Sequence, residues 1–324
     1  MPKLLITGVT GLIGKAVLNG VLAKDSDWHC TALIRPETKA QRYNAFSTQL
    51  DLVKIDLADI KGLKNFLAHN SFDAVMHIGA LRGGRKFTKN EFLRANFLST
   101  QQLAEHSLQS GAKFMFCSSV GVFGAIPEEL PANNQTERNP DNFYHYTKIE
   151  SEKMIQRATL KGLKAAILRP SITYGIGDRG FPYQMVKMVH KKHFPLINKR
   201  IWIHLCNVNT IANAFVWLLE NDYKPGLALN VADREPVQLH QLVNFISREL
   251  RGSNYGSLLR LDQQFFRWGE KLARLAKNEL WISRFELISR SWFYQVSDTY
   301  ELMKLPETFT IPDIRLTISD YLGK

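Results

Sequence analysis

The chain has 324 residues, of which 45% are hydrophobic and 22% are charged, a balance that excludes a wholly disordered or fibrous protein. Its 42 Lys and Arg outnumber its 30 Asp and Glu, which leaves a net charge of +12. Such a surplus favours a phosphate-bearing or otherwise anionic partner, whether a cofactor, a substrate, a nucleic acid or a lipid.

Cysteine usage and the N-terminus bear on the compartment. Cys30, Cys117 and Cys206 are odd in number and lack metal-ligand spacing, so we expect no disulfide framework and no metal site. The first residues enter a strand-and-glycine pattern at once, without room for a signal peptide. No apolar stretch approaches the roughly 20 residues of a transmembrane helix. The sequence therefore predicts a soluble, cytoplasmic protein.

The first half of the chain alternates short apolar runs with longer helical patterns. The apolar, β-branched runs that predict strands cover residues 3–7, 29–34, 51–55, 74–78, 113–117 and 164–168. The helical patterns between them include residues 12–23, 60–69, 92–110 and 145–160. Because continuous apolar runs separated by helices are typical of buried parallel strands, we predict an α/β fold with a Rossmann-type doubly wound parallel sheet.

This alternation loosens after Pro170. Helical patterns at 185–190, 211–220 and 239–250 flank one more strand-like run at 227–232, and the chain from about 258 reads as helical, basic and aromatic. We expect an NAD(P)-binding Rossmann domain over 1–170 and a smaller, mostly helical substrate-binding region over 171–324. The chain is expected to cross back to the sheet near 203–232.

A glycine motif follows the first predicted strand and opens the first predicted helix. It consists of Gly8, Gly11 and Gly14 within Thr-Gly-Val-Thr-Gly-Leu-Ile-Gly. Glycines with this spacing allow a tight turn and a close backbone approach to a pyrophosphate, and the helix N-terminus offers free N–H groups. A tight turn without a ligand uses the same residue type, but the position at the first strand favours phosphate binding.

The end of the second predicted strand bears on the choice of cofactor. Arg35 stands where an acidic residue would bind the ribose of NAD, and an arginine there suits the 2′-phosphate of NADP. A solvated arginine at a strand end is the alternative, and Glu37 lies close by in the sequence. We favour NADP and keep NAD open.

Two further motifs carry residues typical of proton transfer. Tyr144 and Lys148 stand four residues apart at the start of a helical pattern, hence on one face of a helix. An ammonium beside a phenol would lower the phenol pKa toward neutrality. Ser118 and Ser119 directly follow the fifth predicted strand, where a hydroxyl can bind a substrate oxygen or cap the backbone.

Taken together and in order, these motifs resemble the extended short-chain dehydrogenase/reductase family, also called the NAD-dependent epimerase/dehydratase family. The resemblance runs over most of residues 1–250. It is carried by the glycine motif, Asp56-Leu57, His77-Ile78-Gly79-Ala80, Asn96 to Thr100, Ser118-Ser119, Tyr144 with Lys148, and Arg169 to Gly175.

The resemblance implies a role for each matching residue. Ser119 would polarise the substrate oxygen, Tyr144 would transfer the proton, and Lys148 would lower the pKa of Tyr144 and hold the nicotinamide ribose. Asn96 would support the backbone near the site. The remaining positions expected along the cofactor are Thr10, Leu12, Ile13, Asp56, Leu57, Ala80, Pro170 and Ile172. The implied chemistry is hydride transfer at the nicotinamide coupled to proton transfer through Tyr144.

Enzymes of this family catalyse several reactions, and two differences between this chain and its relatives narrow the choice of reaction. Related sugar dehydratases carry an acidic residue just after the catalytic Ser or Thr, where this chain has Val120 and Gly121. Ile203 stands where nucleotide-sugar enzymes commonly place an arginine. We therefore predict an oxidoreductase acting on a secondary alcohol or ketone. The alternatives are a nucleotide-sugar 4-epimerase and a non-catalytic cofactor-binding or scaffolding protein.

The C-terminal half suggests the nature of the partners. Residues 179–219 contain six Lys or Arg and no Asp or Glu, which suits an anionic substrate or a solvated face. Residues 258–295 interleave aromatic with basic residues, which fits packing of the smaller region, a lid over a hydrophobic substrate or a peripheral membrane contact. A nucleic-acid partner is not expected, because the net positive charge alone would suggest one. The family resemblance suggests a homodimer.

Overall fold

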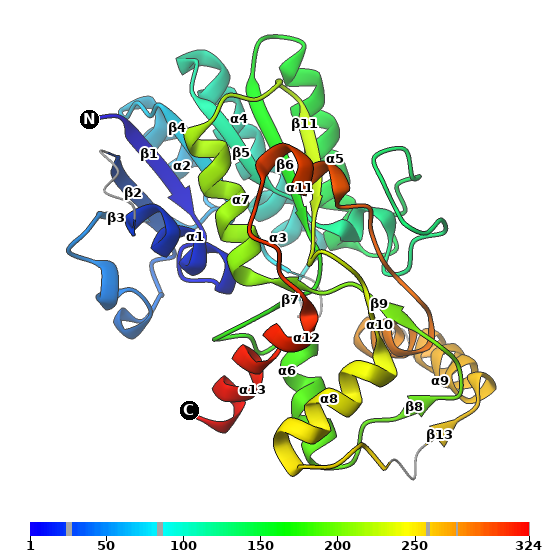
Figure 1. Ribbon diagram of the computed structural model, residues 1–324. Coiled ribbons are helices and arrows are strands. Elements are labelled where there is room, and N and C mark those ends of the chain that lie inside the picture. Colours follow the sequence, from blue (N-terminus) through cyan, green and yellow to red (C-terminus); the bar gives the residue numbers. More distant parts are fainter. Residues whose placement is uncertain (24–27, 83–86, 257–259, 277, 324) are drawn as a thin grey trace. The chain divides into compact units, whose positions relative to one another are not determined.

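The computed structural model describes residues 1–23, 28–82, 87–256, 260–276 and 278–323 (Figure 1). Seven of the described strands form one sheet in the order β11-β6-β5-β4-β1-β2-β3. They are β1 (Lys3–Thr7), β2 (His29–Ile34), β3 (Asp51–Lys54), β4 (Ala74–His77), β5 (Lys113–Cys117), β6 (Lys164–Pro170) and β11 (Leu227–Val231).

The strand order places a reversal of winding beside β1. From β1 the chain continues outward through β2 and β3, and it then returns to pair β4 with the other side of β1 before continuing to β5 and β6; these pairings are parallel. In open α/β sheets, ligands bind at the carboxyl ends of the strands flanking such a reversal. The fold thus directs attention to the loops after β1 and β4, and the predicted Rossmann-type fold is confirmed.

The first compact unit consists of 1–122, 140–169 and 211–229. Helices α2, α4 and α5 bury Leu63, Leu103 and Ile155 in a core with the strands, while Gly20 of α1 lies against Val216 of α7. The helical segments of this unit are α1 (Leu12–Leu22), η1 (Ala40–Arg42), η2 (Asn44–Phe46), α2 (Ile60–Ala68), α3 (Lys89–Phe92), η3 (Leu93–Leu98), α4 (Ser99–Ser110), η4 (Val120–Phe123, apart from its last residue), α5 (Phe143–Thr159) and, apart from its first residues, α7 (Val208–Glu220).

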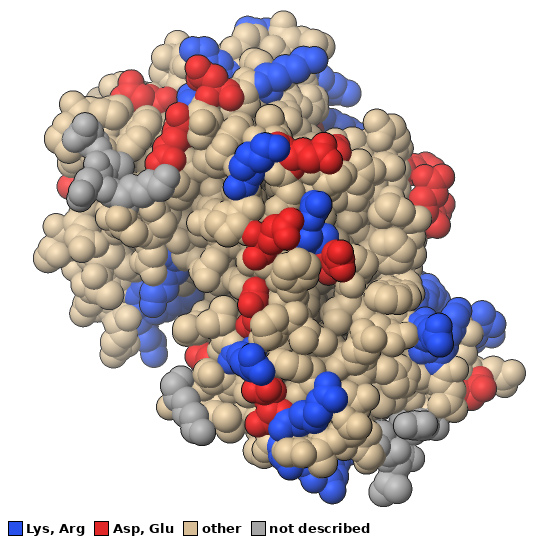
Figure 2. All heavy atoms as spheres, viewed as in Figure 1, with Lys and Arg blue, Asp and Glu red and all other residues tan. Residues whose placement is uncertain are grey.

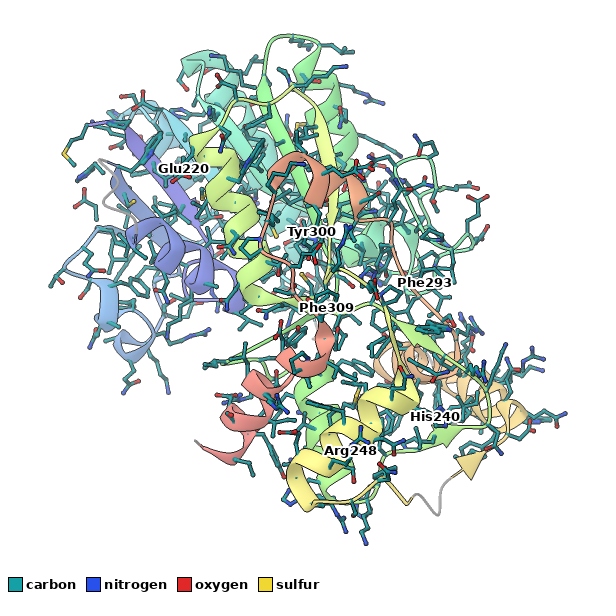
Figure 3. The ribbon with its side chains drawn as sticks, in the orientation of Figure 1. Glu220, His240, Arg248, Phe293, Tyr300 and Phe309 are labelled. Atoms are coloured by element: carbon teal, nitrogen blue, oxygen red, sulfur yellow. The ribbon has the colours of Figure 1, made fainter. Side chains whose placement is uncertain are left out.

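The second compact unit consists of 123–139, 170–210 and 230–324. Its helices are α6 (Phe181–His190), α8 (Leu239–Arg251), α9 (Gln263–Leu275), α10 (Glu279–Ser289), α11 (Ser297–Met303), α12 (Thr310–Asp313) and α13 (Arg315–Leu322). Short strands pair as β7 (Thr173–Tyr174) with β10 (Cys206–Asn207), β9 (Trp202–Ile203) with β12 (Val237–Gln238), and β8 (Leu196–Ile197) with β13 (Arg260–Leu261). Tyr300 of α11 donates a hydrogen bond to the Ala232 carbonyl, which holds the C-terminal segment in this unit (Figure 3).

The compact units are not contiguous in sequence, and the assignment of 1–170 to cofactor binding and of 171–324 to substrate binding stays a prediction. The segment 123–139, expected in the first domain, belongs to the second unit, and 211–229 returns to the first. The return brings Gly226 into hydrogen-bond contact with β6, where its N–H reaches the Ala165 carbonyl at 2.8 Å.

The predicted helix at 92–110 is interrupted. Between α3 and α4 the chain forms one stretch of π-helix, η3, in which Asn96 is buried. Short stretches of π-helix inside α-helices are frequent at functional sites. Its amide oxygen accepts from the Leu81 N–H, and its amide nitrogen donates to the Leu81 carbonyl and the Thr147 hydroxyl. None of the described helices is long and apolar enough to cross a membrane.

Candidate functional site

The glycine loop after β1 is built by backbone contacts that exclude side chains. A Cβ on Gly14 would lie 2.1 Å from the Gly8 carbonyl oxygen, and one on Gly8 would lie 2.6 Å from the Gly79 nitrogen. Gly8 also has φ +81°, a conformation that L residues rarely adopt. The loops after β1 and β4 are therefore in direct backbone contact, and α1 begins behind them at Leu12 with Gly11 as its N-cap.

This loop fits a dinucleotide. The N-terminus of α1 includes Leu12, Ile13 and Gly14, its first turn contains no acidic residue, and Gly11 adds no side chain that would cover its N–H groups. Unpaired N–H groups and the partial positive charge of a helix N-terminus are what a pyrophosphate binds. Thr10 contributes its carbonyl oxygen to a different contact, a 2.6 Å hydrogen bond from Arg42.

A buried chain of hydrogen bonds holds the two loops in register. The Thr7 hydroxyl accepts from the N–H groups of Ile78 and Gly79, so its proton points to His77 Nδ1 at 2.8 Å. His77 Nε2 then donates to the Thr100 hydroxyl at 2.9 Å. Burial, assisted by the charge of Lys148, lowers the pKa of His77 to about 3, so this imidazole is neutral in the folded protein.

The expected adenosine end of the site is polar and open. Arg35 follows β2, is exposed, and pairs with Glu37 at 3.2 Å. Arg42 lies in η1 and donates to the Thr10 carbonyl in the glycine loop. The sequence analysis missed this contact because the two residues are 32 positions apart. Asp56 follows β3 and accepts from the Ala58 N–H at 2.8 Å.

Leu57, Ala80 and Asn96 surround the loop after β4. The Leu57 side chain lies 2.8 Å from where a Cβ on Gly79 would be, and Ala80 is exposed. Asn96 clamps the backbone of Leu81, next to Ala80, as described above. This geometry agrees with the support role expected for Asn96 rather than with direct contact to a ligand.

The two adjacent serines after β5 differ in their surroundings. Ser118 is buried and donates to Glu152 Oε1 at 2.5 Å, and Glu152 forms a two-pronged ion pair with Arg169 at 2.7–2.8 Å. Ser119 is half-buried, and its hydroxyl accepts from the Gly121 N–H at 3.0 Å. Ser118 is thus tied into a buried network, and Ser119 is the hydroxyl that reaches Tyr144.

Tyr144 and Lys148 lie in the first turns of α5, beside Ser119. The Ser119 side chain hydrogen-bonds to Tyr144. Lys148 is 2% exposed, donates to the Cys117 carbonyl at 2.7 Å, and lies 6.0 Å from the centre of the Tyr144 ring. The residues expected to form a catalytic group are therefore brought together by the end of β5 and the start of α5.

The electrostatics of this group differ from the sequence expectation. Burial raises the pKa of Tyr144 above its usual value, Ser119 and Arg82 act in the opposite direction, and Lys148 is not among the groups that lower it. Burial also lowers the pKa of Lys148 to about 8. The ammonium group of Lys148 donates to the Cys117 carbonyl rather than to the phenol of Tyr144.

His145, which the sequence reading passed over, occupies the space beside Gly121. A Cβ on Gly121 would lie 2.1 Å from His145 Nε2, while the Nδ1 side of the ring pairs with Asp141. The acidic residue that sugar dehydratases carry near this position could not be accommodated here without moving His145. The glycine at position 121 was the sequence signal for this contact. The reason for a glycine there is the His145 ring, which lies where a side chain would be.

Pro170 and Ile172, the last two residues expected along the cofactor, belong to the second unit. Pro170 ends β6, and the Ile172 carbonyl accepts from the Cys206 N–H at 3.0 Å. Their role as cofactor contacts stays a prediction.

Comparison with known proteins identifies the class. The sequence model of the NAD dependent epimerase/dehydratase family matches residues 4–232. The chain therefore belongs to the NAD-dependent epimerase/dehydratase family, whose enzymes are of the extended short-chain dehydrogenase/reductase type.

Individual relatives point to more than one reaction. The chain is 30% identical to a UDP-glucose 4-epimerase of Azospirillum brasilense over 52% of this chain and 48% of that one, about half the relative's length. It is 23% identical to a 3 beta-hydroxysteroid dehydrogenase/Delta 5-->4-isomerase of Mycobacterium tuberculosis over 74% and 67%. The fold is similar to that of a UDP-glucuronic acid 4-epimerase from Bacillus cereus in complex with NAD, with TM-score 0.75, 18% identity and 99% of each chain covered.

Proposed function

We propose that the chain is an NAD(P)-dependent oxidoreductase that moves a hydride between the nicotinamide and a secondary alcohol or ketone. The observation that carries the proposal is the grouping of three residues at the end of β5 and the start of α5: Ser119 acts on the phenol of Tyr144, and the buried Lys148 Nζ lies 6.0 Å from the centre of the Tyr144 ring. A nicotinamide dinucleotide supplies the hydride donor or acceptor when bound. Gly8, Gly11, Gly14 and the N-terminus of α1 are the proposed pyrophosphate site.

In this proposal the protein residues handle the proton. Because burial raises the pKa of Tyr144, the phenol carries its proton at neutral pH and can donate it to a carbonyl oxygen. Ser119 donates a second hydrogen bond to the same oxygen, where negative charge grows. Lys148, held by the Cys117 carbonyl, keeps a positive charge beneath the phenol at neutral pH.

Replacement of Tyr144 tests the proposal. We expect Tyr144→Phe to reduce ketone-dependent oxidation of NADPH or NADH by about 10²–10⁴-fold, while cofactor affinity measured by fluorescence stays near wild type. Tyr146→Phe is the matched control, because Tyr146 lies in the same turn of α5 but is 41% exposed. A Tyr144→Phe enzyme that turns over a panel of ketones like the wild type contradicts the proposal.

A nucleotide-sugar 4-epimerase is the second candidate, favoured by the Azospirillum relative. Ile203 weighs against it, because an aliphatic side chain carries no charge or hydrogen-bond donor with which to bind a diphosphate as the expected arginine would. Mass analysis of the nucleotide released on denaturation separates the two. A stoichiometric cofactor kept through purification favours the epimerase, which regenerates its cofactor. An empty protein that binds NADPH favours the reductase.

For the cofactor we propose NADP over NAD. The family description and the Bacillus cereus complex name NAD, whereas Arg35 and Arg42 place two exposed guanidinium groups near the glycine loop and the end of β2. Two arginines suit a 2′-phosphate, which they can bind by charge-assisted hydrogen bonds. We expect Arg35→Ser and Arg42→Ser each to weaken NADPH binding by about tenfold and leave NADH binding unchanged. Equal losses for both cofactors would contradict this preference.

A further inference from the structure

Helix α9 exposes an apolar stripe in addition to the face that it buries. Phe266 and Ala273 face inward, whereas Phe265, Trp268, Leu272 and Leu275 are exposed by 53%, 65%, 64% and 81%. These four residues are spaced by three, four and three positions, so they share one side of the helix. A second apolar face of this kind is not needed to pack the helix in its unit.

Aromatic contacts that pass through the buried ring of Phe266 join α9 to α10, where a further aromatic side chain is exposed. The rings of Phe265, Phe266, Phe285 and Trp281 follow one another at 5.9–6.4 Å between centres, and Trp281 is 47% exposed. Gly269 permits this approach, because a Cβ there would lie 2.6 Å from the Phe285 ring. We call the exposed Phe265, Trp268, Leu272, Leu275 and Trp281 the hairpin face.

Charges on the same hairpin are sorted by sign. The side chains of Glu270 and Glu286 are 11% and 10% exposed and pair with Arg274 and Arg290, whose side chains are 55% and 41% exposed. The carboxylates therefore lie inward while the guanidinium groups reach solvent. In Figure 2, Lys and Arg side chains gather at the edge of the second unit where α9 and α10 lie.

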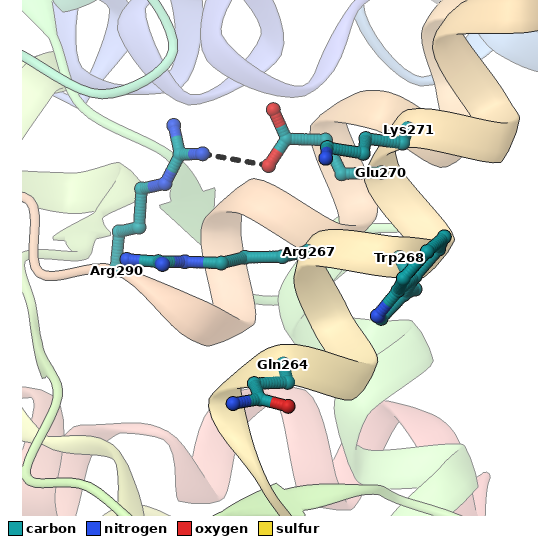
Figure 4. Close-up of a pocket in the computed structure, with 6 residues that line it drawn as sticks. All are labelled: Gln264, Arg267, Trp268, Glu270, Lys271 and Arg290. Atoms are coloured by element: carbon teal, nitrogen blue, oxygen red, sulfur yellow. Dashed lines mark hydrogen bonds and ion pairs between the residues drawn. The ribbon is translucent and has the colours of Figure 1, made fainter.

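Basic groups also border the apolar stripe directly. A cavity of about 460 Å³ beside α9 is lined by Gln264, Arg267, Trp268, Glu270, Lys271 and Arg290 (Figure 4). Lys271 Nζ lies 5.5 Å from the Trp268 ring centre, and the Arg284 guanidinium lies 5.1 Å from that of Trp281. The indoles of Trp268 and Trp281 thus each have a cation beside them.

We propose that the hairpin face docks the protein on an anionic lipid bilayer. Trp and Phe sit at the level of lipid headgroups, Leu reaches the acyl boundary, and adjacent Lys and Arg bind headgroup phosphates. The same apolar face with a basic border does not suit a two-fold contact with a second copy, because that contact would set each basic border against itself. Leu272 and Leu275 offer no stacking surface to a nucleic acid.

Sedimentation of the full chain with lipid vesicles tests the proposal. We expect binding to phosphatidylcholine vesicles that contain phosphatidylserine, weak binding to phosphatidylcholine alone, and loss of binding as salt is raised. Trp268→Ser with Leu272→Ser should lower the bound fraction at least tenfold, as should Arg267→Glu with Lys271→Glu. The matched controls are Leu160→Ser, at an 89% exposed leucine, and Lys61→Glu with Lys64→Glu on α2; both should bind like the wild type.

A fluorescence experiment places Trp268 itself in the bilayer. Trp268→Phe keeps an apolar side chain, so it should still sediment with the vesicles, while the quenching of tryptophan emission by brominated lipids should be weaker than in the wild type and come from Trp281. Circular dichroism checks that each variant is folded. The proposal is overturned if wild type fails to bind phosphatidylserine vesicles or if the hairpin variants bind as well as their controls. A dimer in light scattering that Trp268→Ser with Leu272→Ser dissociates would also overturn it, since the second copy would then cover the face.

Discussion

Around α5, charged side chains of both signs are buried, whereas in the hairpin formed by α9 and α10 the carboxylates are buried and the basic groups reach solvent. Lys148, Glu152 and Arg169 are 2%, 5% and 2% exposed and are held by direct hydrogen bonds within the first unit. In the hairpin the carboxylates are buried but their arginine partners reach solvent. A fully buried network holds a reacting group in one position, whereas a half-exposed one keeps a surface positively charged. The difference separates a site for chemistry from a surface for contact.

The largest loss of stability is expected from breaking the buried ion pair between Glu152 and Arg169. Glu152→Gln leaves the Arg169 guanidinium buried without its ion pair, which should lower the free energy of unfolding by about 3–5 kcal/mol. Glu286→Gln should cost no more than about 1 kcal/mol, because the arginines that it leaves remain hydrated. Denaturant unfolding of the two variants measures the contrast, and equal losses would mean that burial of the arginine does not decide the energy.

Two glycines give the next contrast. In Gly14→Ala the new Cβ meets the Gly8 carbonyl, which is backbone in a loop with no room to move. We expect cofactor affinity to fall by at least about tenfold and stability by about 1–3 kcal/mol. Gly269→Ala meets the Phe285 ring, a side chain that can rotate away, and should cost less than about 1 kcal/mol. Calorimetric titration of cofactor and thermal unfolding check both, and a normal affinity in Gly14→Ala would remove the loop from the proposed site.

Stability should depend on pH through buried histidines, none of which lies in the hairpin. Burial lowers the pKa of His77 to about 3 and that of His204 to about 4, below the usual 6.5 of the unfolded chain. As pH falls from 6.5 to 4 the unfolded state takes up protons that the folded state does not, so stability decreases by about 1.4 kcal/mol per pH unit for each histidine. His77→Gln should flatten this slope, and His69→Gln, at an exposed position, should not. A slope unchanged by His77→Gln would contradict the assignment.

The smallest effect on folding is expected in the hairpin itself. Lys271→Gln removes an exposed ammonium and should change the free energy of unfolding by less than about 0.5 kcal/mol. The same variant should bind phosphatidylserine vesicles less tightly by roughly fivefold, since each basic group near an anionic surface contributes about 1 kcal/mol. A loss of stability without a loss of vesicle binding would assign Lys271 to packing.

Much of the first unit could be predicted because its elements have strong local signals. The predicted strands at 3–7, 29–34 and 113–117 match β1, β2 and β5 residue for residue, since each is a continuous apolar run ended by a helix or loop signal. The π stretch at η3 was missed because its apolar spacing resembles that of an ordinary helix. The contact that accompanies it, between Asn96 and the backbone of Leu81, joins residues 15 positions apart.

The burial of the C-terminal aromatic residues, by contrast, could not be predicted from the sequence. Trp292 is fully buried and Trp268 is 65% exposed, although both stand in similar aromatic and basic surroundings in the sequence. Packing of the smaller region was one of the open interpretations, and it holds for Trp292 but does not account for the exposed Trp268. Whether a side chain is buried depends on which helices and strands pack against it, and a short window of sequence does not contain that information.

By itself, the sequence determined the fold class, the family and the position of the glycine loop, because hydrophobic periodicity and glycine spacing are local properties of the chain. Only the tertiary structure decided that Ser118 belongs to the Glu152–Arg169 network while Ser119 meets Tyr144, and that Lys148 is directed to the Cys117 carbonyl. It also decided that His145 fills the space beside Gly121 and that Arg42 reaches Thr10. These are contacts between segments separated along the chain, and burial, hydrogen bonding and pKa all follow from such contacts.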